Sequence, residues 1–123
     1  MTEEELQALL EKTTPEGGRH ALFVEECGDQ DVRVRFTPVD SSTATLLALV
    51  DIALRAAAGV EAGLANLNVT MLRAPHAGAD VIALSRVLKR DRDLVHAECW
   101  LFSHAVVEPM LHATATMRHP PRS

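Results

Sequence analysis

One stretch of the sequence, ATLLALVDIALRAAAG from Ala44 to Gly59, constrains the fold more than any other. Its apolar residues surround a single carboxylate, Asp51, and the next charged residue, Arg55, follows one helical turn later. A helix that is apolar on every side is normally buried, so this segment predicts a central helix in the core. An ionised carboxylate is rarely buried without a partner or a chemical role, which makes Asp51 the first candidate for a functional residue.

Segments on both sides of this helix have the patterns of β-strands. Before it, Val32, Val34 and Phe36 alternate with two arginines, which is the period-2 pattern of a half-buried strand. After it, apolar segments are separated by Pro, Gly and charged turn residues. We expect strands at 20–27, 31–38, 64–75, 80–90, 93–107 and 110–119. With a short helix before them, this order predicts an α+β fold, in which one long central helix packs on a curved antiparallel sheet.

Length, charge and composition limit the classes of protein. The 123 residues favour a single domain over 1–123, with an N-terminal helix at 1–14 and a tail at 119–123. A net charge of −5 and only three Phe, one Trp and no Tyr argue against a nucleic-acid partner. The apolar helix contains two charges and is shorter than the roughly 20 residues of a membrane span, so no membrane partner is expected. Two distant cysteines, Cys27 and Cys99, and an acidic first segment unlike a secretory leader favour a cytoplasmic protein with reduced thiols.

The strand expected at 80–90 is apolar on both faces. One face carries small residues that let a helix approach closely, namely Val81, Ala83, Ser85 and Val87. The other face carries Ile82, Leu84 and Leu88. An apolar outer face predicts a second cover for the sheet, most simply another copy of the chain.

These elements together resemble the hotdog-fold acyl-CoA thioesterases of the PaaI type. The resemblance covers about 20–118 and rests on ATLLALVDIAL as the central helix, LNVTMLRAP as the next strand, and ADVIALSRVLKRDRDLVHAECW with HATATM as the strand meander. Two short sequence motifs of the family correspond to Leu49-Val50-Asp51 and Met71-Leu72-Arg73-Ala74 in this chain. The resemblance implies a hotdog fold, a homodimer or homotetramer, and hydrolysis of an acyl-CoA or similar thioester in a cleft between subunits.

The resemblance also implies roles for individual residues. In similar enzymes the aspartate at the position of Asp51 faces the dimer interface and acts as general base or nucleophile on the thioester. Backbone N–H groups around Ser42, Thr43 and Ala44 would polarise the thioester oxygen. The candidates for the phosphates of coenzyme A are basic residues near the cleft mouth: Arg73, Lys89, Arg90 and Arg92. No metal and no redox cofactor is implied.

The sequence departs from the family at several of these positions. Ser42-Thr43-Ala44 stands where most PaaI-type enzymes have His-Gly-Gly, and the added Cβ atoms would narrow the approach to the backbone. The family's asparagine in the preceding loop has no counterpart. Leu64 stands where a serine or threonine often helps to hold the attacking water. Asp51 is the retained element, and it is the one that carries the chemistry in relatives.

Other interpretations of these residues stay open. Asp51 and Arg55 have the i, i+4 spacing of a structural ion pair, and Ser42 and Thr43 are common helix N-caps. The basic residues at 89–92 fit a solvated hairpin turn. The alternative function is therefore a non-catalytic hotdog module that binds acyl-CoA or serves as an assembly partner. A hotdog dehydratase or hydratase is disfavoured, because no histidine lies near Asp51 in the sequence.

Two further sites are weak on sequence grounds. His96 and Glu98 share a strand face and His112 is expected beside them, but no HxxxH or CxxC spacing supports a metal site. Cys99 is expected on the face opposite Glu98, which disfavours a cysteine nucleophile paired with these residues.

Overall fold

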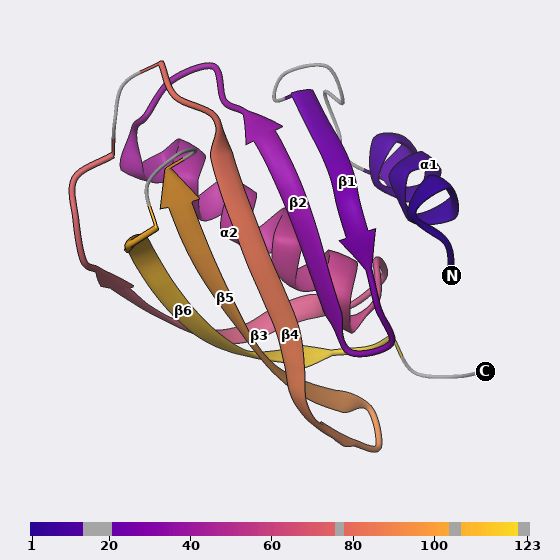
Figure 1. Ribbon diagram of the computed structural model, residues 1–123. Helices are drawn as coiled ribbons and strands as arrows, with labels where there is room; N and C mark the ends of the chain where they lie inside the picture. Colours follow the sequence, from indigo (N-terminus) through magenta and orange to yellow (C-terminus); the bar gives the residue numbers. More distant parts are fainter. Residues whose placement is uncertain (14–20, 76–77, 104–106, 121–123) are drawn as a thin grey trace.

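The computed structural model of the protein describes residues 1–13, 21–75, 78–103 and 107–120. The elements follow the predicted order of helix, two strands, long helix and four strands (Figure 1). They are α1 (Glu3–Thr13), β1 (Ala21–Cys27), β2 (Asp31–Thr37), α2 (Thr43–Ala58), β3 (Gly63–Met71), β4 (Val81–Asp91), β5 (Leu94–Ser103) and β6 (Pro109–Arg118). The parts of the expected segments at 14–20, 76–77, 104–106 and 121–123 lie outside the described residues.

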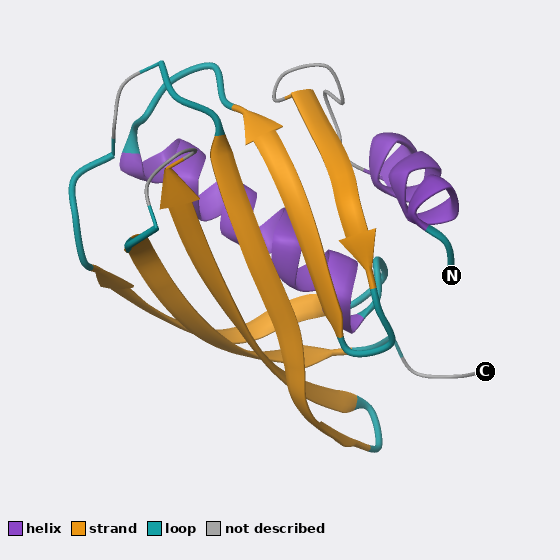
Figure 2. Cartoon of the chain, viewed as in Figure 1, coloured by secondary structure: helices purple, strands orange, loops and turns teal. Residues whose placement is uncertain are grey.

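The six strands form one sheet in the order β1-β2-β4-β5-β6-β3, and every neighbouring pair is antiparallel. The sheet curves around α2, which runs across its inner face (Figure 2). This arrangement confirms the predicted fold class, an α+β fold with a long central helix on a curved antiparallel sheet. Within the described part of the chain, neither helix is long and apolar enough to cross a membrane.

Small residues on β4 and β5 allow α2 to lie close to the sheet. Ala83, Ala97 and Cys99 have no exposed surface, and all three lie on the inner face under the helix. The buried Ser85 hydroxyl donates a hydrogen bond of 2.7 Å to the backbone carbonyl of Ala53, in the middle of α2. The prediction of which side of β4 faces the helix is therefore confirmed. Ser85 on this side is small and also forms a hydrogen bond to the helix.

The two ends of α2 are fixed by local chemistry. Ser42 is the N-cap, with its side-chain oxygen accepting from the Thr45 N–H. The helix ends at Gly59, whose N–H donates to the Arg55 carbonyl at 2.8 Å. Gly59 has φ +134°, and a Cβ there would lie 2.7 Å from Cε1 of His119. A glycine is therefore required where the chain leaves the helix.

The two edges of the sheet differ in their cover. β1 forms one edge, and α1 lies along it, with Leu6 and Leu10 buried in the core. β3 forms the other edge, and most of its residues are exposed. α2 packs mainly on β4, β5 and β2, and on the β3 edge Leu67 and Val69 are only partly buried against the core.

Candidate functional site

Asp51 lies halfway along α2, on the stripe of the helix that the sheet leaves uncovered. Ala44 and Ala48 are exposed on this stripe, whereas Leu49 and Ala53 on the opposite side have no exposed surface. The Asp51 side chain is 39% exposed. The result is a half-exposed carboxylate surrounded by apolar residues, which answers part of the question raised by the sequence: Asp51 is not buried within one chain.

Arg55 is the observed partner of this carboxylate. Its Nε lies 3.4 Å from Oδ2 of Asp51, at the i, i+4 spacing expected from the sequence. The arginine side chain is only 16% exposed, so it is the more buried member of the pair. The ion pair joins the guanidinium to one carboxylate oxygen, Oδ2, and the Asp51 side chain keeps more than a third of its surface exposed.

A polar network closes the N-terminus of α2. Oδ1 of Asp40 accepts hydrogen bonds from the Ser42 N–H at 2.9 Å, the Ser42 hydroxyl at 2.7 Å and the Thr45 hydroxyl at 2.5 Å. Ser42 therefore acts as the N-cap, which is the structural role that the sequence left open for it. Thr43 and Ala44 are exposed in the first turn, where backbone N–H groups have no acceptor within the helix.

The candidate substrate-binding residues lie at opposite ends of α2 within one chain. Arg73 belongs to the end near Ser42, since its N–H donates to the Met110 carbonyl at 3.1 Å, and Met110 lines a hollow with Asp40 and Leu46 of the N-terminal turn region. Leu64 belongs to the other end, where it pairs with Met117 at the start of β3. At 1.5 Å per residue, the 16-residue helix separates these ends by about 24 Å.

Arg90 also lies at the C-terminal end of α2, in a role that the sequence did not indicate. Its Nη1 donates to the carbonyl of Ala58, the last helical residue, at 3.3 Å. A cation at this position is favoured by the helix dipole. β4 continues to Asp91, one residue beyond the expected strand, and Arg92 (φ 52°) and Asp93 form the hairpin turn.

The outer face of the sheet carries an ionic cluster. Glu98, whose side chain is only 9% exposed, accepts from Nε of Arg86 at 2.5 Å and contacts Nε2 of His112 at 3.0 Å. The ring of His112 stacks on Trp100 with centroids 3.9 Å apart. Burial alone would raise the pKa of Glu98, but the hydrogen bonds from His112 and Arg86 outweigh it and hold the pKa below its usual value. The carboxylate is therefore ionised and fully engaged.

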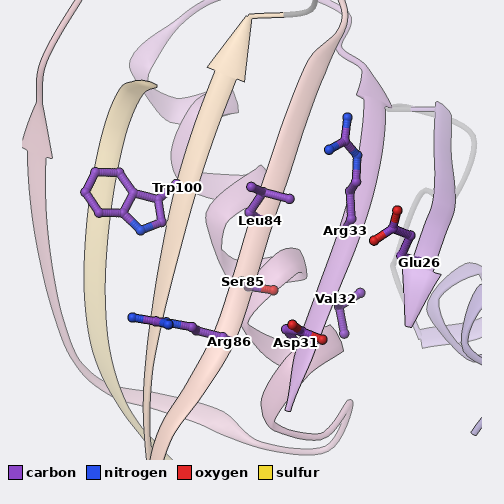
Figure 3. Close-up of a pocket in the computed structure, with 8 residues that line it drawn as sticks. All are labelled: Glu26, Asp31, Val32, Arg33, Leu84, Ser85, Arg86 and Trp100. Atoms are coloured by element: carbon purple, nitrogen blue, oxygen red, sulfur yellow. The ribbon is translucent and has the colours of Figure 1, made fainter. Parts of the chain in front are cut away.

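Beside this cluster the outer face is hollowed over β2 and β4. The hollow has a volume of about 390 Å³, and Arg33 and Arg86 reach it from neighbouring strands (Figure 3). Its other lining residues are Glu26, Asp31, Val32, Leu84, Ser85 and Trp100. Charges of both signs and one aromatic ring share this surface, and the sequence alone gave no reason to place Trp100 there.

The structure also places the residues of the possible metal site and of the possible cysteine nucleophile. The expected group around Glu98 is present, but among the described residues no three His, Cys, Asp or Glu side chains are placed to hold a metal ion. Cys99 lies fully buried on the inner face, opposite Glu98 as predicted, and burial raises the pKa of its thiol far above the ordinary value. A protonated, buried thiol is a poor nucleophile.

Solved structures place this architecture among known folds, although no protein-family model and no curated protein sequence match the chain. A candidate thioesterase from Silicibacter sp. TM1040 is 24% identical, with a TM-score of 0.84 over 98% of this chain and 93% of that one. The E. coli PaaI protein of the phenylacetic acid degradation operon is 12% identical, with a TM-score of 0.83 over 96% and 93%. Zebra fish thioesterase superfamily member 2 is 15% identical, with a TM-score of 0.80 over 98% and 99%. The chain therefore has the hotdog fold of thioesterase-superfamily structures, including the PaaI type, as the resemblance in its sequence predicted.

Proposed function

We propose that this protein hydrolyses an acyl-CoA or similar thioester in a cleft between two copies of the chain, with Asp51 as the catalytic carboxylate. The observation that carries the proposal is the half-exposed carboxylate of Asp51 on the uncovered apolar stripe of α2. A carboxylate among apolar residues is well placed to act on a bound apolar acyl group, because these surroundings limit its hydration.

Two copies are needed because the candidate substrate-binding residues of one chain lie about 24 Å apart along α2, at 1.5 Å per residue. The exposed edge of β3 offers the simplest way to add a second copy. Pairing of β3 with its symmetry mate in antiparallel orientation would bring the Met71 end of one strand to the Gly63 end of the other. The Ser42 and Arg73 end of one copy would then meet the Leu64 and Arg90 end of its partner.

In the proposed reaction, the N–H groups of Thr43 and Ala44 polarise the thioester carbonyl at the positive end of the helix dipole. Asp51 either accepts a proton from the attacking water or attacks the carbonyl carbon itself. The C–S bond breaks, the coenzyme A thiol leaves, and one water is consumed per acid released. Arg73, whose side chain is 54% exposed, and Arg90 are the proposed contacts for the phosphates. The reaction requires neither a metal nor a redox cofactor.

The test is a free-thiol release assay on a panel of short, long and aromatic acyl-CoAs. We expect turnover by the natural chain, and its loss in Asp51→Asn and Asp51→Ala with little change in the melting temperature or in the mass of the assembly. Arg55→Ala is the matched control, because it removes the ion pair and leaves the carboxylate in place. Turnover retained in Asp51→Ala would contradict the catalytic role.

The alternative, a hotdog module that binds acyl-CoA without hydrolysing it, is favoured by two observations. Asp51 is engaged by Arg55, and Thr43 and Ala44 present Cβ atoms at the start of α2. A binding module would show a higher melting temperature with acyl-CoA, and the ligand would be recovered intact. In that case Asp51→Ala and Arg55→Ala would lower the stability by similar amounts.

The remaining parts of the proposal concern the chain as a whole. We infer a single domain over 1–123, since both helices pack on one sheet. A cytoplasmic location is supported by two free thiols, Cys27 and Cys99, which suit a reducing compartment.

A further inference from the structure

The side chain of Gln7 links α1 to the outer edge of β1. Its Nε2 donates to the backbone carbonyl of Leu22 at 2.9 Å, and its Oε1 accepts from the backbone N–H of Val24 at 2.7 Å. Nε2 also lies 2.8 Å from Oε1 of Glu11, so both amide hydrogens have acceptors. The half-buried side chain of Gln7 thus provides hydrogen-bond partners for two main-chain groups of a neighbouring strand.

These two groups are the ones that a further strand would use. β1 is an edge strand whose other side pairs with β2, so the C=O of Leu22 and the N–H of Val24 point away from the sheet. A primary amide carries one carbonyl acceptor and an N–H donor in the arrangement of a peptide group. Gln7 therefore stands in for a residue of an adjacent strand.

The position of Gln7 is fixed by the packing of α1. Leu6 is 1% exposed and Leu10 has no exposed surface, so the helix is anchored in the same core as Val24. At its start, the Thr2 hydroxyl accepts from the Glu5 N–H at 3.2 Å, and Glu5 Oε1 accepts from the Thr2 N–H at 3.4 Å. The helix holds Gln7 against the edge.

The β1 strand itself carries only part of the usual protection of an edge, namely an irregularity in its pairing between Val24 and Glu26 and the exposed charge of Glu26. Its sequence, ALFVEEC, contains no Lys and no Pro, which often guard exposed edges. Phe23 is 53% exposed on it. The charge of Glu25 is neutralised by Arg33 at 2.9 Å and by Arg35 at 3.8 Å. Without α1, this strand would offer unpaired backbone groups and apolar surface to other copies.

We propose that α1 is an edge cap, in which Gln7 occupies the positions that β1 of a second copy would otherwise take. With this edge closed, sheet extension is confined to the β3 edge and stops when two copies have paired. With it open, pairing at both edges would produce an open-ended array of copies. The proposal uses the β3 pairing of the proposed function but not the role of Asp51, so loss of activity and loss of the cap are separate results.

The test compares Gln7→Ala with Glu11→Ala in the full chain. Glu11→Ala removes a contact of the same glutamine but leaves its bonds to Leu22 and Val24 in place. In Gln7→Ala we expect the Val24 amide to exchange about tenfold faster, as the loss of one hydrogen bond predicts. We also expect the mass measured by light scattering to rise with concentration beyond that of the natural chain. Glu11→Ala should match the natural chain in both measurements.

A second variant distinguishes edge pairing from aggregation of unfolded chains. Phe23→Lys, added to Gln7→Ala, places on β1 a charge of the kind that protects natural edge strands. The double variant should have the same mass in light scattering as the natural chain. Persistent growth of the assembly in the double variant would overturn the proposal. So would an unchanged mass in Gln7→Ala with a fast-exchanging Val24 amide, because the opened edge would then have recruited no second copy.

Discussion

Ser85 donates its hydroxyl hydrogen to the backbone carbonyl of Ala53 at 2.7 Å, which ties β4 to α2 two residues beyond Asp51. The serine is 2% exposed, and the carbonyl lies on the buried side of the helix. The bond therefore fixes the depth and the rotation of α2 on the sheet at the turn that carries the candidate carboxylate.

Ser85→Ala should lower the free energy of unfolding by about 1 kcal/mol, because it removes one buried hydrogen bond and adds no strain. Urea unfolding of the variant measures the effect. If Asp51 is catalytic, the same substitution should also reduce kcat more than it changes KM, since the position of the carboxylate is loosened. An unchanged stability would show that the contact contributes nothing.

Gly59→Ala should destabilise the protein by about 1–3 kcal/mol, because the backbone angle is unfavourable for a side chain. The new Cβ would also meet the ring of His119. Gly63→Ala is the matched control, since among the described residues none beyond its chain neighbours lies within 4 Å of its added Cβ, and its backbone has no such angle. Adding His119→Ala to Gly59→Ala should recover only the part due to the contact, as a thermal unfolding series would show.

The Glu98 cluster should make stability depend on pH. The pKa of Glu98 is lowered in the folded state, so its contribution is present above the unfolded pKa and is lost as the pH falls through the folded pKa. We expect the free energy of unfolding to decrease below about pH 4.3, the ordinary pKa of a glutamate, and the decrease to be smaller in Glu98→Gln. Glu108→Gln, which alters an exposed ion pair with Arg73, should leave the pH profile nearly unchanged.

Ala44→Gly tests whether the departure from the family at the start of α2 restricts the substrate. Removing this Cβ should open the approach to the first-turn N–H groups and raise kcat/KM on the preferred acyl-CoA several-fold. Ala48→Gly is the control, because both alanines are exposed on the same stripe and each loses about 1 kcal/mol of helix stability. Equal kinetic effects of the two variants would rule out a specific steric restriction.

The sequence predicted the features that depend on local periodicity. The apolar run around Asp51 located α2, the alternation at Val32 and Val34 located β2, and the i, i+4 spacing indicated the contact with Arg55. Opposite faces of β5 for Glu98 and Cys99 followed from the period of a strand. Each of these inferences joins residues that are close in the chain.

The features that the sequence missed depend on register between distant segments. Arg90 reaches Ala58, 32 residues earlier, only because β4 continues to Asp91 along the end of α2. Gln7 resembles any polar residue of a surface helix, and its bonds to Leu22 and Val24 span 15 and 17 residues. Periodicity cannot place such contacts, since they are set by how whole elements pack.

The placement of the candidate residues at opposite ends of α2 has a consequence for solution behaviour. In the proposed pairing, the dimer has two sites, and each site takes one half from each chain. Dissociation on dilution should therefore abolish both sites together, so the specific activity should depend on protein concentration. Two inactive variants, one altered at Arg73 and the other at Arg90, should regain activity when their subunits are exchanged. A subunit altered at one end would then disable one of the two sites in every mixed dimer.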